Sequence, residues 1–444
     1  MTTAIILFVL GTPIGIWWYY DAKWGRQLDK ELAALRAQEA PLTIIEAVPA
    51  PPPDDENAAV LYQEIFQVRF GSDAPAWPEG QKAQWLLKDV TGALEYDDDN
   101  NVVLDAKARE LLSSPEAQKV LETLRRGSEM PYFVFPVNWE DGFGALFPHV
   151  AQCRNAARLN AAYARLLAKD GRTGEALDWC TVSLRISEQT ATEPTQVAQL
   201  VSYAIQAITF KTTRDVVSAA EVLPAVAREL DAYLSGIDLD GPFEAALQGK
   251  RAVGCDAYEL FRRDPQQLWQ ELATHVEEGA PWGGLYCNSV ARPLHKLDQL
   301  EYLEYTAKQQ DLLVLPYRDA VSELAALAAT PPRPFIAAII APVLGSISRR
   351  RDQAAAEIGL CRIVLALKAY KHTRNSYPAT LGQLQQTLQH ALPKDPFSGE
   401  DFVYQPQGEG FKLYSLGGDL DDDGGVPPDE ANPGDGDIVW ECIR

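Results

Sequence analysis

The chain has 444 residues, enough for two or three domains that each bury a core. Its 46% hydrophobic and 9% aromatic residues are typical of a folded globular protein and argue against extensive disorder. The 62 acidic residues exceed the 40 basic ones and give a net charge of -22. Because the only dense basic run is residues 349–351, nucleic acid is not an expected partner.

The N-terminus is predicted to be a membrane anchor. Residues 3–20 are eighteen uncharged residues, close to the roughly 20 that a helix needs to cross a bilayer core. The aromatic cluster at 17–20 and the following Lys23 and Arg26 are typical of a membrane–water interface. No small-residue cleavage site follows this run, so residues 1–40 are expected to form an uncleaved transmembrane helix and its juxtamembrane extension.

The sequence gives two conflicting indications of the side of the membrane on which the body lies. Basic residues after the span favour a cytoplasmic body, whereas the C-terminal features described below favour the periplasmic side of a bacterial inner membrane. We therefore predict a single-pass inner-membrane protein with a periplasmic body. The alternative for the apolar run is a buried N-terminal helix in a soluble protein.

The next segments are predicted to be a linker and a helical domain. Residues 41–55 contain three successive prolines, which favour an extended, solvated linker. Residues 56–330 contain amphipathic patterns separated by Gly and Pro, which predict an almost entirely helical domain. Within it, residues 155–187 predict a helical hairpin around Asp170 and Gly171 that resembles one tetratricopeptide unit. No second copy follows at a period of about 34 residues. Packing for stability and a peptide-binding groove are both open interpretations.

Catalytic signals in this domain are weak. The histidines His149, His275 and His295 are far apart, and none lies in a motif typical of a metal enzyme or a nucleophile. The Trp- and Tyr-rich stretch 278–306 is compatible with a ligand groove and with core packing. The sequence therefore favours a protein that is not an enzyme. A hydrolase with its site in the helical domain is the alternative.

The cysteines do not form a zinc motif, because they are scattered and lack CxxC spacing. Their even number allows disulfides outside the cytoplasm, and buried free thiols are the other interpretation. The six cysteines are Cys153, Cys180, Cys255, Cys287, Cys361 and Cys442.

A second Pro-rich break near residue 330 predicts a C-terminal module at 331–444. Its apolar run 335–347 is interrupted by Pro342 and is too short to span a bilayer, so burial is expected. A long helix from residue 349 follows, with one apolar face suited to packing on a sheet. This face comprises Ile358, Cys361, Leu365 and Leu367.

Residues 401–405 and 410–415 alternate as two short antiparallel strands joined by a Gly-bearing turn. Around these strands the chain carries Tyr377-Pro378, Leu381, Leu384, Pro393-Lys394-Asp395-Pro396 and Leu413-Tyr414-Ser415-Leu416-Gly417. Together with the preceding helix, this order resembles the major pseudopilin (protein G) of type II secretion systems over about residues 350–440. The resemblance implies an α+β module with a long helix on a small antiparallel sheet.

After Leu416 the chain is strongly acidic, with eight carboxylates and no basic residue between Asp419 and Asp437. Like charges at this density repel one another unless a cation or solvent neutralises them. Calcium is the expected cation, because it takes 6 to 8 oxygen ligands and glycines allow the turns that aim them. The spacing does not match an EF-hand loop. A disordered acidic loop is the alternative.

The resemblance also implies particular ligands for calcium. Its metal joins the loop after the Ser-Leu-Gly turn to a terminal Asp-x-Asp-Ile segment. The implied ligands here are the side chains of Asp419, Asp435 and Asp437 and the backbone carbonyl of Leu416. Four further acids are available as substitutes in a loop longer than usual: Asp421, Asp422, Asp423 and Asp429.

A pseudopilin also carries a basic leader, a Gly-Phe cleavage site and a Glu in its apolar helix, and none of these adjoins the module. The resemblance therefore implies the fold and the metal site more than assembly into a pseudopilus. From the sequence we expect a membrane-anchored envelope scaffold or interaction protein with protein partners, linked to secretion. A hydrolase and a helical peptide-binding adaptor are the alternatives.

Overall fold

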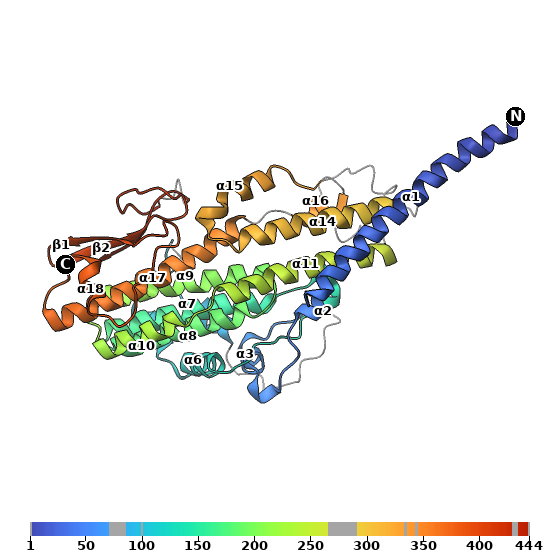
Figure 1. The fold of residues 1–444 in the computed structure, drawn as a ribbon. Helices are drawn as coiled ribbons and strands as arrows, with labels where there is room; N and C mark the ends of the chain where they lie inside the picture. Colours follow the sequence, from blue (N-terminus) through green and yellow to red (C-terminus); the bar gives the residue numbers. More distant parts are fainter. Residues whose placement is uncertain are drawn as a thin grey trace.

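A computed structural model of the chain describes residues 2–70, 86–98, 101–264, 291–332, 335–341, 345–428 and 434–442, without the side chains of residues 2–12 and 335. The fold is mainly α-helical with one small antiparallel sheet near the C-terminus, as the sequence predicts. In Figure 1 the helices form a long bundle, with the N-terminus at one end and the sheet at the other.

The first half of the chain forms the N-terminal helices and the three helices at the centre of the bundle. They are α1 (Thr2–Ala37), α2 (Ile44–Ala47), the 3₁₀ helix η1 (Asp54–Glu56), α3 (Ala58–Phe66), α4 (Leu87–Gly92), α5 (Ala106–Leu112), α6 (Pro115–Ser128), the 3₁₀ helix η2 (Trp139–Gly144), α7 (Pro148–Lys169), α8 (Thr173–Ala191) and α9 (Gln196–Ala219).

The second half adds further helices and the sheet. These elements are α10 (Pro224–Ser235), α11 (Asp240–Arg263), α14 (Arg292–Leu313), α15 (Tyr317–Ala328), α16 (Phe335–Ile340), α17 (Gly345–Arg374), α18 (Leu381–Gln385), β1 (Val403–Gln407), β2 (Gly410–Ser415) and β3 (Ile438–Cys442).

Helix α1 is about 54 Å long at 1.5 Å per residue, and only its second half packs on the body. Leu28 is buried there against the neighbouring helix α14. An ion pair between Asp21 and Lys296 (2.7 Å) ties the start of this contact to α14. The preceding turns project beyond the bundle in Figure 1.

The membrane span is predicted at residues 3–20, and the structure does not describe the side chains of residues 3–12 within it. A search of the described residues finds no helix that is both long and apolar enough to cross a membrane. Among the described residues of the projecting part, Ile14, Ile16, Trp18 and Tyr19 are more than half exposed.

The Pro-rich segment at 41–55 is attached to the body rather than fully solvated. Thr43 caps α2 through a capping box with Glu46, and the N–H of Ile44 donates to Asp256 of α11 (2.7 Å). Leu42 and Ile44 are buried. The segment therefore connects α1 to the body through a fixed contact with α11.

The centre of the bundle is the three-helix unit α7, α8 and α9. The predicted hairpin is confirmed, with α7 and α8 joined by a turn in which Gly171 has φ +76°, a conformation that favours glycine. Buried alanines on α7, among them Ala157 and Ala164, let the helices approach closely. Thr195 then caps α9 by accepting from the N–H of Ala198 (3.1 Å).

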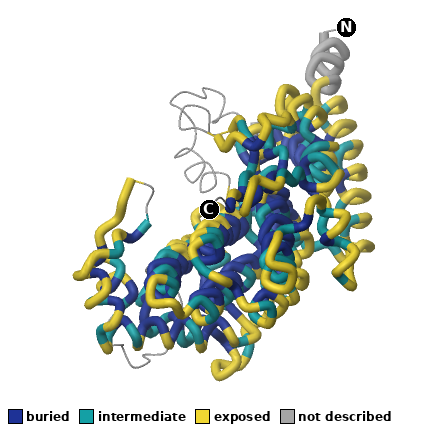
Figure 2. Tube along the Cα trace, turned by 90° about the vertical axis from the view of Figure 1, so that its left-hand side faces the viewer, coloured by how far each residue is buried: buried dark blue, intermediate teal, exposed yellow. Residues whose placement is uncertain are grey.

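Helix α17 belongs to this same packed core. Its Glu357 pairs with Arg214 of α9 (2.9 Å), and its Arg362 pairs with Asp231 of α10 (2.8 Å). One cluster of buried residues runs from Ala58 to Cys442, so the core continues across residue 330. Figure 2 shows the buried residues gathered where the helices face one another. The division at 55/56 and 330/331 stays a prediction.

The basic run at 349–351 does not form one solvated face. Arg351 is buried, donates to the carbonyl of Leu315 (2.7 Å) and pairs with Asp352 (2.9 Å). Asp352 accepts from the N–H of Tyr317, the first residue of α15 (2.7 Å). These bonds fix the first turns of α17 against the start of α15.

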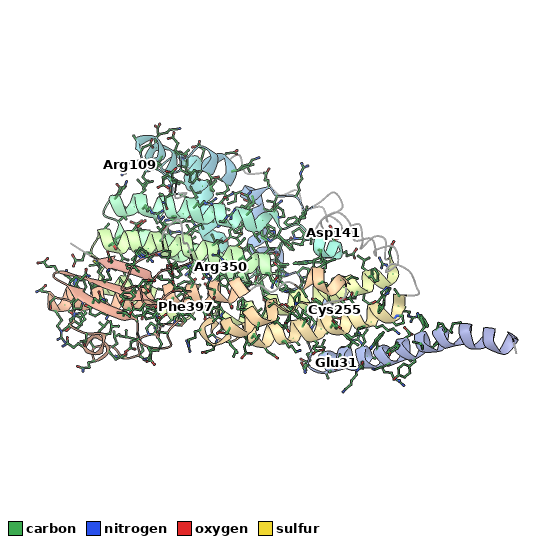
Figure 3. The ribbon with its side chains drawn as sticks, turned by 90° about the horizontal axis from the view of Figure 1, so that it is seen from above. Glu31, Arg109, Asp141, Cys255, Arg350 and Phe397 are labelled. Atoms are coloured by element: carbon green, nitrogen blue, oxygen red, sulfur yellow. The ribbon has the colours of Figure 1, made fainter. Side chains whose placement is uncertain are left out.

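The sheet has the order β1-β2-β3, with both pairs antiparallel. The strand predicted at 401–405 corresponds to β1, which begins two residues later, and the strand predicted at 410–415 coincides with β2. Strand β3 is an addition to the two strands predicted from the sequence. Helix α17 lies against the segment before β1, since a Cβ on Gly359 would lie 2.7 Å from the ring of Phe402. Figure 3 places Phe397, which precedes β1, and Glu31 of α1 in opposite halves of the molecule.

The buried apolar faces agree with the sequence. Cys361, Leu365 and Leu367 of α17 are buried and Ile358 is partly buried. In the predicted apolar run, Ile336, Ala337, Ile340, Ala341 and Ile347 are buried, and residues 342–344 lie outside the description.

Candidate metal centre

The acidic segment forms the connection between β2 and β3. Ser415 at the end of β2 pairs with Ile438 at the start of β3, so the two ends of the connection lie side by side. A Cβ on Gly417, which has φ +77°, would lie 2.4 Å from the carbonyl oxygen of Gly436. Gly436 has φ +115°, so both positions need glycine, and the sheet closes the acidic segment into a loop.

Asp395 fixes the start of this loop. It is 1% exposed, accepts from the hydroxyl of Ser415 (2.6 Å) and from the N–H of Leu416 (3.3 Å), and also accepts from the N–H of Phe397 (3.1 Å). In the sequence Asp395 is part of the Pro393-Lys394-Asp395-Pro396 motif, which predicts no particular role for its side chain. Its position between two prolines was the only signal.

Asp437 closes the other end of the loop. Its side chain is 0% exposed, its Oδ2 accepts from the N–H of Gly425 (2.7 Å), and its own N–H donates to the carbonyl of Val426 (2.8 Å). Its Oδ1 is buried and has no hydrogen-bond partner among the described residues. Burial and the charges of Asp422 and Asp423 raise the pKa of Asp437 to about 6, although the Gly425 bond opposes this.

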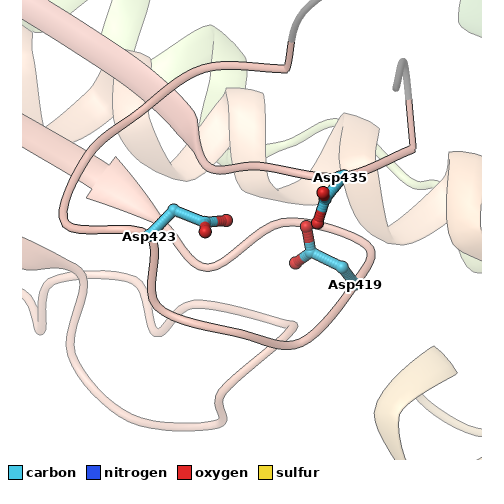
Figure 4. A group of neighbouring side chains, drawn as sticks. All are labelled: Asp419, Asp423 and Asp435. Carbon is cyan, nitrogen blue, oxygen red and sulfur yellow. The ribbon is translucent and has the colours of Figure 1, made fainter. Parts of the chain in front are cut away.

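Three other carboxylates converge inside the loop, as Figure 4 shows: Asp419, Asp423 and Asp435. Each offers one oxygen, and these oxygens all lie within 4.8 Å of one another. Asp419 is partly exposed, and the other two are exposed. Together they form a group that can hold a metal ion.

The loop is arranged by bonds from backbone N–H groups to these carboxylates. Asp419 accepts from the N–H of Gly436 and, through its other oxygen, from the N–H of Asp421 (3.2 Å). Asp422 accepts from the hydroxyl of Tyr414 (3.1 Å). Desolvation and then the like charges of Asp419 and Asp435 raise the pKa of Asp423, so an added positive charge in the group is favoured.

The guanidinium-bearing side chain of Arg349 lies beside this loop. A Cβ on Gly418 would lie 2.6 Å from its Cδ, and one on Gly434 would lie 3.4 Å from its Nη1. Among the described residues no carboxylate lies within 4.0 Å of Arg349. The Arg349 side chain therefore lies next to the acidic group but forms no ion pair with it.

The sequence-predicted ligands are brought together in part. Asp419 and Asp435 are within the metal-competent group, and Asp423, expected as a substitute, completes it. Asp437 lies outside the group and bonds to Gly425, and the N–H of Leu416 bonds to Asp395. Asp421 and Asp422 bond within the loop, and Asp429 lies outside the described residues.

The other described candidates for chemistry, His149 and His295, are buried in the body. His149 is 0% exposed, lies 2.6 Å from Glu193 through Nε2, and stacks on Phe135 with ring centroids 4.4 Å apart. His295 is 9% exposed against Phe261. His275 and much of the aromatic stretch 278–306 lie outside the described residues. The described positions of His149 and His295 fit roles in packing.

The described cysteines are all buried and unbridged. They are Cys153, Cys180, Cys255, Cys361 and Cys442, and Cys287 lies outside the description. Burial raises the pKa of Cys153 to about 12, which keeps it as a thiol and a poor nucleophile.

Comparison of the chain with protein-family models found no match, and comparisons with curated proteins and with solved structures also found none. The acidic loop and the projecting helix α1 therefore carry the functional proposal.

Proposed function

We propose that this chain is a membrane-anchored, calcium-binding envelope protein that serves as a scaffold or interaction protein rather than an enzyme. The observation that carries the proposal is the convergence of Asp419, Asp423 and Asp435 at the closed end of the sheet. Helix α1 supplies the anchor in this account, and the body lies on the periplasmic side of the inner membrane.

Calcium suits the group for geometric reasons. Calcium–oxygen distances are about 2.3–2.6 Å, so two oxygens on one ion lie at most about 5 Å apart. The separation of 4.8 Å or less among the three carboxylates meets this condition. Backbone carbonyls, including that of Leu416, and water are the proposed source of the remaining ligands. The buried Oδ1 of Asp437 adds negative charge that a nearby cation would offset.

The arrangement of α1 supports anchoring. The Asp21–Lys296 ion pair and the buried Leu28 hold its second half on the body, while exposed Trp18 and Tyr19 lie on the projecting part. Trp and Tyr favour the membrane–water interface. In Figure 1 the sheet lies at the end opposite α1, so the proposed calcium loop would face away from the membrane.

The C-terminal module supports a link to secretion. The pseudopilin resemblance implies a long helix on a small antiparallel sheet with a metal-binding loop, and here α17 lies beside the sheet and the metal-competent group lies in the loop after β2. In this chain the long helix of the module, α17, also packs on α9 and α10. The module is therefore attached to the helical body through this helix.

The proposed calcium site is tested by thermal unfolding of the full chain in calcium, in magnesium and in chelator. Binding to the folded state alone stabilises by about 2.7 kcal/mol when calcium is at 100 times its Kd. We expect a calcium-specific rise in Tm that Asp419→Asn/Asp435→Asn abolishes. The matched control, Asp54→Asn/Asp55→Asn, removes two exposed acids of η1 and should retain the rise. An unchanged Tm for the parent chain in calcium would contradict the proposal.

A further inference from the structure

A cavity lies at the end of the bundle where α10 and α17 meet the segment that follows α18 (Figure 1). Its volume is about 520 Å³, within the range of about 300–1,000 Å³ typical of small-molecule sites. Its walls come from α10, from the last turns of α17 and from residues 387–390 after α18.

The floor of the cavity is apolar. Ala227 of α10 and Leu365 of α17 line it and are fully buried. Ala369, Tyr370 and Leu388 line it and are partly buried. An apolar group placed here would leave water without displacing any buried ion pair.

The walls are fixed by Asp231, which joins all three of them. One oxygen of this α10 side chain accepts from Nε of Arg362 on α17 (2.8 Å), and the other lies 3.2 Å from Nε2 of His390. The loop bearing His390 is itself tied down, because Gln385 donates to the carbonyl of His390 (2.8 Å) and accepts from the N–H of Leu392 (2.7 Å). The cavity is therefore preorganised.

The exposed rim carries an excess of positive charge. Arg228 and Arg374 line the cavity and are exposed, and among the described residues neither has a carboxylate within 4.0 Å. Arg374 lies over the ring of Tyr370, with its Cζ 5.3 Å from the ring centroid. The charge of Asp231 is already matched by Arg362. Two guanidinium groups without an ion pair among the described residues therefore line the same cavity.

From this combination we infer that the cavity binds an amphiphilic carboxylate, of the class of medium-chain fatty acids. The alkyl chain would lie on the floor formed by Ala227 and Leu365, and the carboxylate would lie between Arg228 and Arg374. Arginine suits this role because its planar donors match a carboxylate in a bidentate geometry. This site is independent of the proposed calcium loop.

The test is calorimetric titration of the full chain with octanoate and with octan-1-ol, its uncharged counterpart, each corrected by a titration into the same buffer without protein. We expect octanoate to bind at least about tenfold more tightly than octan-1-ol. In Arg228→Gln/Arg374→Gln the octanoate affinity should fall to that of the alcohol. The control Arg126→Gln/Arg154→Gln removes two exposed arginines elsewhere and should bind octanoate like the parent.

A cavity-filling variant separates binding at this site from adsorption elsewhere. Ala369→Phe places a large side chain in the cavity and should abolish binding of both ligands while the protein remains folded by circular dichroism. Should Ala369→Phe unfold the chain, the arginine double variant decides alone. The inference is overturned if octanoate does not bind, if both ligands bind equally, or if the arginine double variant retains the parent's preference.

Discussion

The helical body and the acidic loop are stabilised by different forces. In the body, α7, α8 and α9 bury apolar side chains in one continuous core, and its stability comes chiefly from removing apolar surface from water. The loop between β2 and β3 contains few apolar groups, and Val426 within it is 57% exposed. Its shape depends on backbone N–H groups that donate to carboxylates.

This difference separates the responses expected of the two regions. Burial of apolar surface does not depend on a metal ion, whereas a loop of converging carboxylates gains stability from a bound cation. Mutations in the body should therefore lower stability equally with and without calcium. Mutations in the loop should act mainly through the calcium response.

The largest effect is expected from breaking the buried pair in the body. Glu193→Ala would leave His149, which is fully buried, without its partner, and loss of one member of such a pair costs about 3–5 kcal/mol. The loss, measured by urea unfolding, should be the same in calcium and in chelator. Glu175→Ala, which removes an exposed pair with Arg172, should change stability by less than about 1 kcal/mol.

A slightly smaller effect is expected where α11 meets the turn between α8 and α9. A Cβ on Gly249 would lie 1.9 Å from the carbonyl oxygen of Pro194, so Gly249→Ala forces the backbone apart and should cost about 3 kcal/mol. On α8, Gly174→Ala meets only Val226 at 3.7 Å and should be neutral or stabilising. Equal urea midpoints for the two variants would show that this contact is not tight.

Asp395 tests the connection between the two regions. Asp395→Ala removes the acceptor for Ser415 and for the N–H of Leu416, so about 2–3 kcal/mol of stability should be lost. Because these bonds fix the start of the loop, calcium affinity should fall as well. Asp401→Ala, at an exposed ion pair with Lys394, is the control and should leave both quantities unchanged. A calcium affinity that survives Asp395→Ala would mean that the loop folds independently of this anchor.

The smallest effect concerns pH. Burial raises the pKa of Asp437 to about 6, above its ordinary value of 3.8, so without a bound cation the folded state binds more protons between these values. Asp437 should therefore make the free energy of unfolding fall as pH rises from about 4 to 6, by on the order of 1–2 kcal/mol. Comparing the parent with Asp437→Asn isolates this contribution, since the variant cannot ionise there. A parallel pH dependence of the two proteins would contradict the assignment.

Much of the fold could be predicted from the sequence because local patterns encode it. The Asp170-Gly171 turn between two amphipathic runs predicts the α7–α8 hairpin, and the alternating residues predict β1 and β2. The attachment of α17 to α9 and α10 could not be predicted, because pairs such as Arg214–Glu357 join residues far apart in the chain. Strand β3 was missed because its five residues acquire strand geometry only by pairing with β2.

The candidate site was predictable in composition and less so in geometry. The run of acids identified the loop, and Asp419 and Asp435 were expected to converge. The inclusion of Asp423 in the group and the burial of Asp437 depend on how Gly417 and Gly436 turn the backbone. Spacing alone does not fix these turns, since glycine allows several conformations.

Hydrogen exchange of the full chain with and without calcium tests the central claim most directly, because it assigns the response to a region. We predict that calcium slows exchange of the backbone amides between Gly417 and Asp437, where Gly425 and Gly436 donate to carboxylates. Amides of α7 to α9 should be unaffected. Unchanged exchange in the loop at saturating calcium, or protection confined to the helical body, would contradict the proposal that this loop is the calcium site.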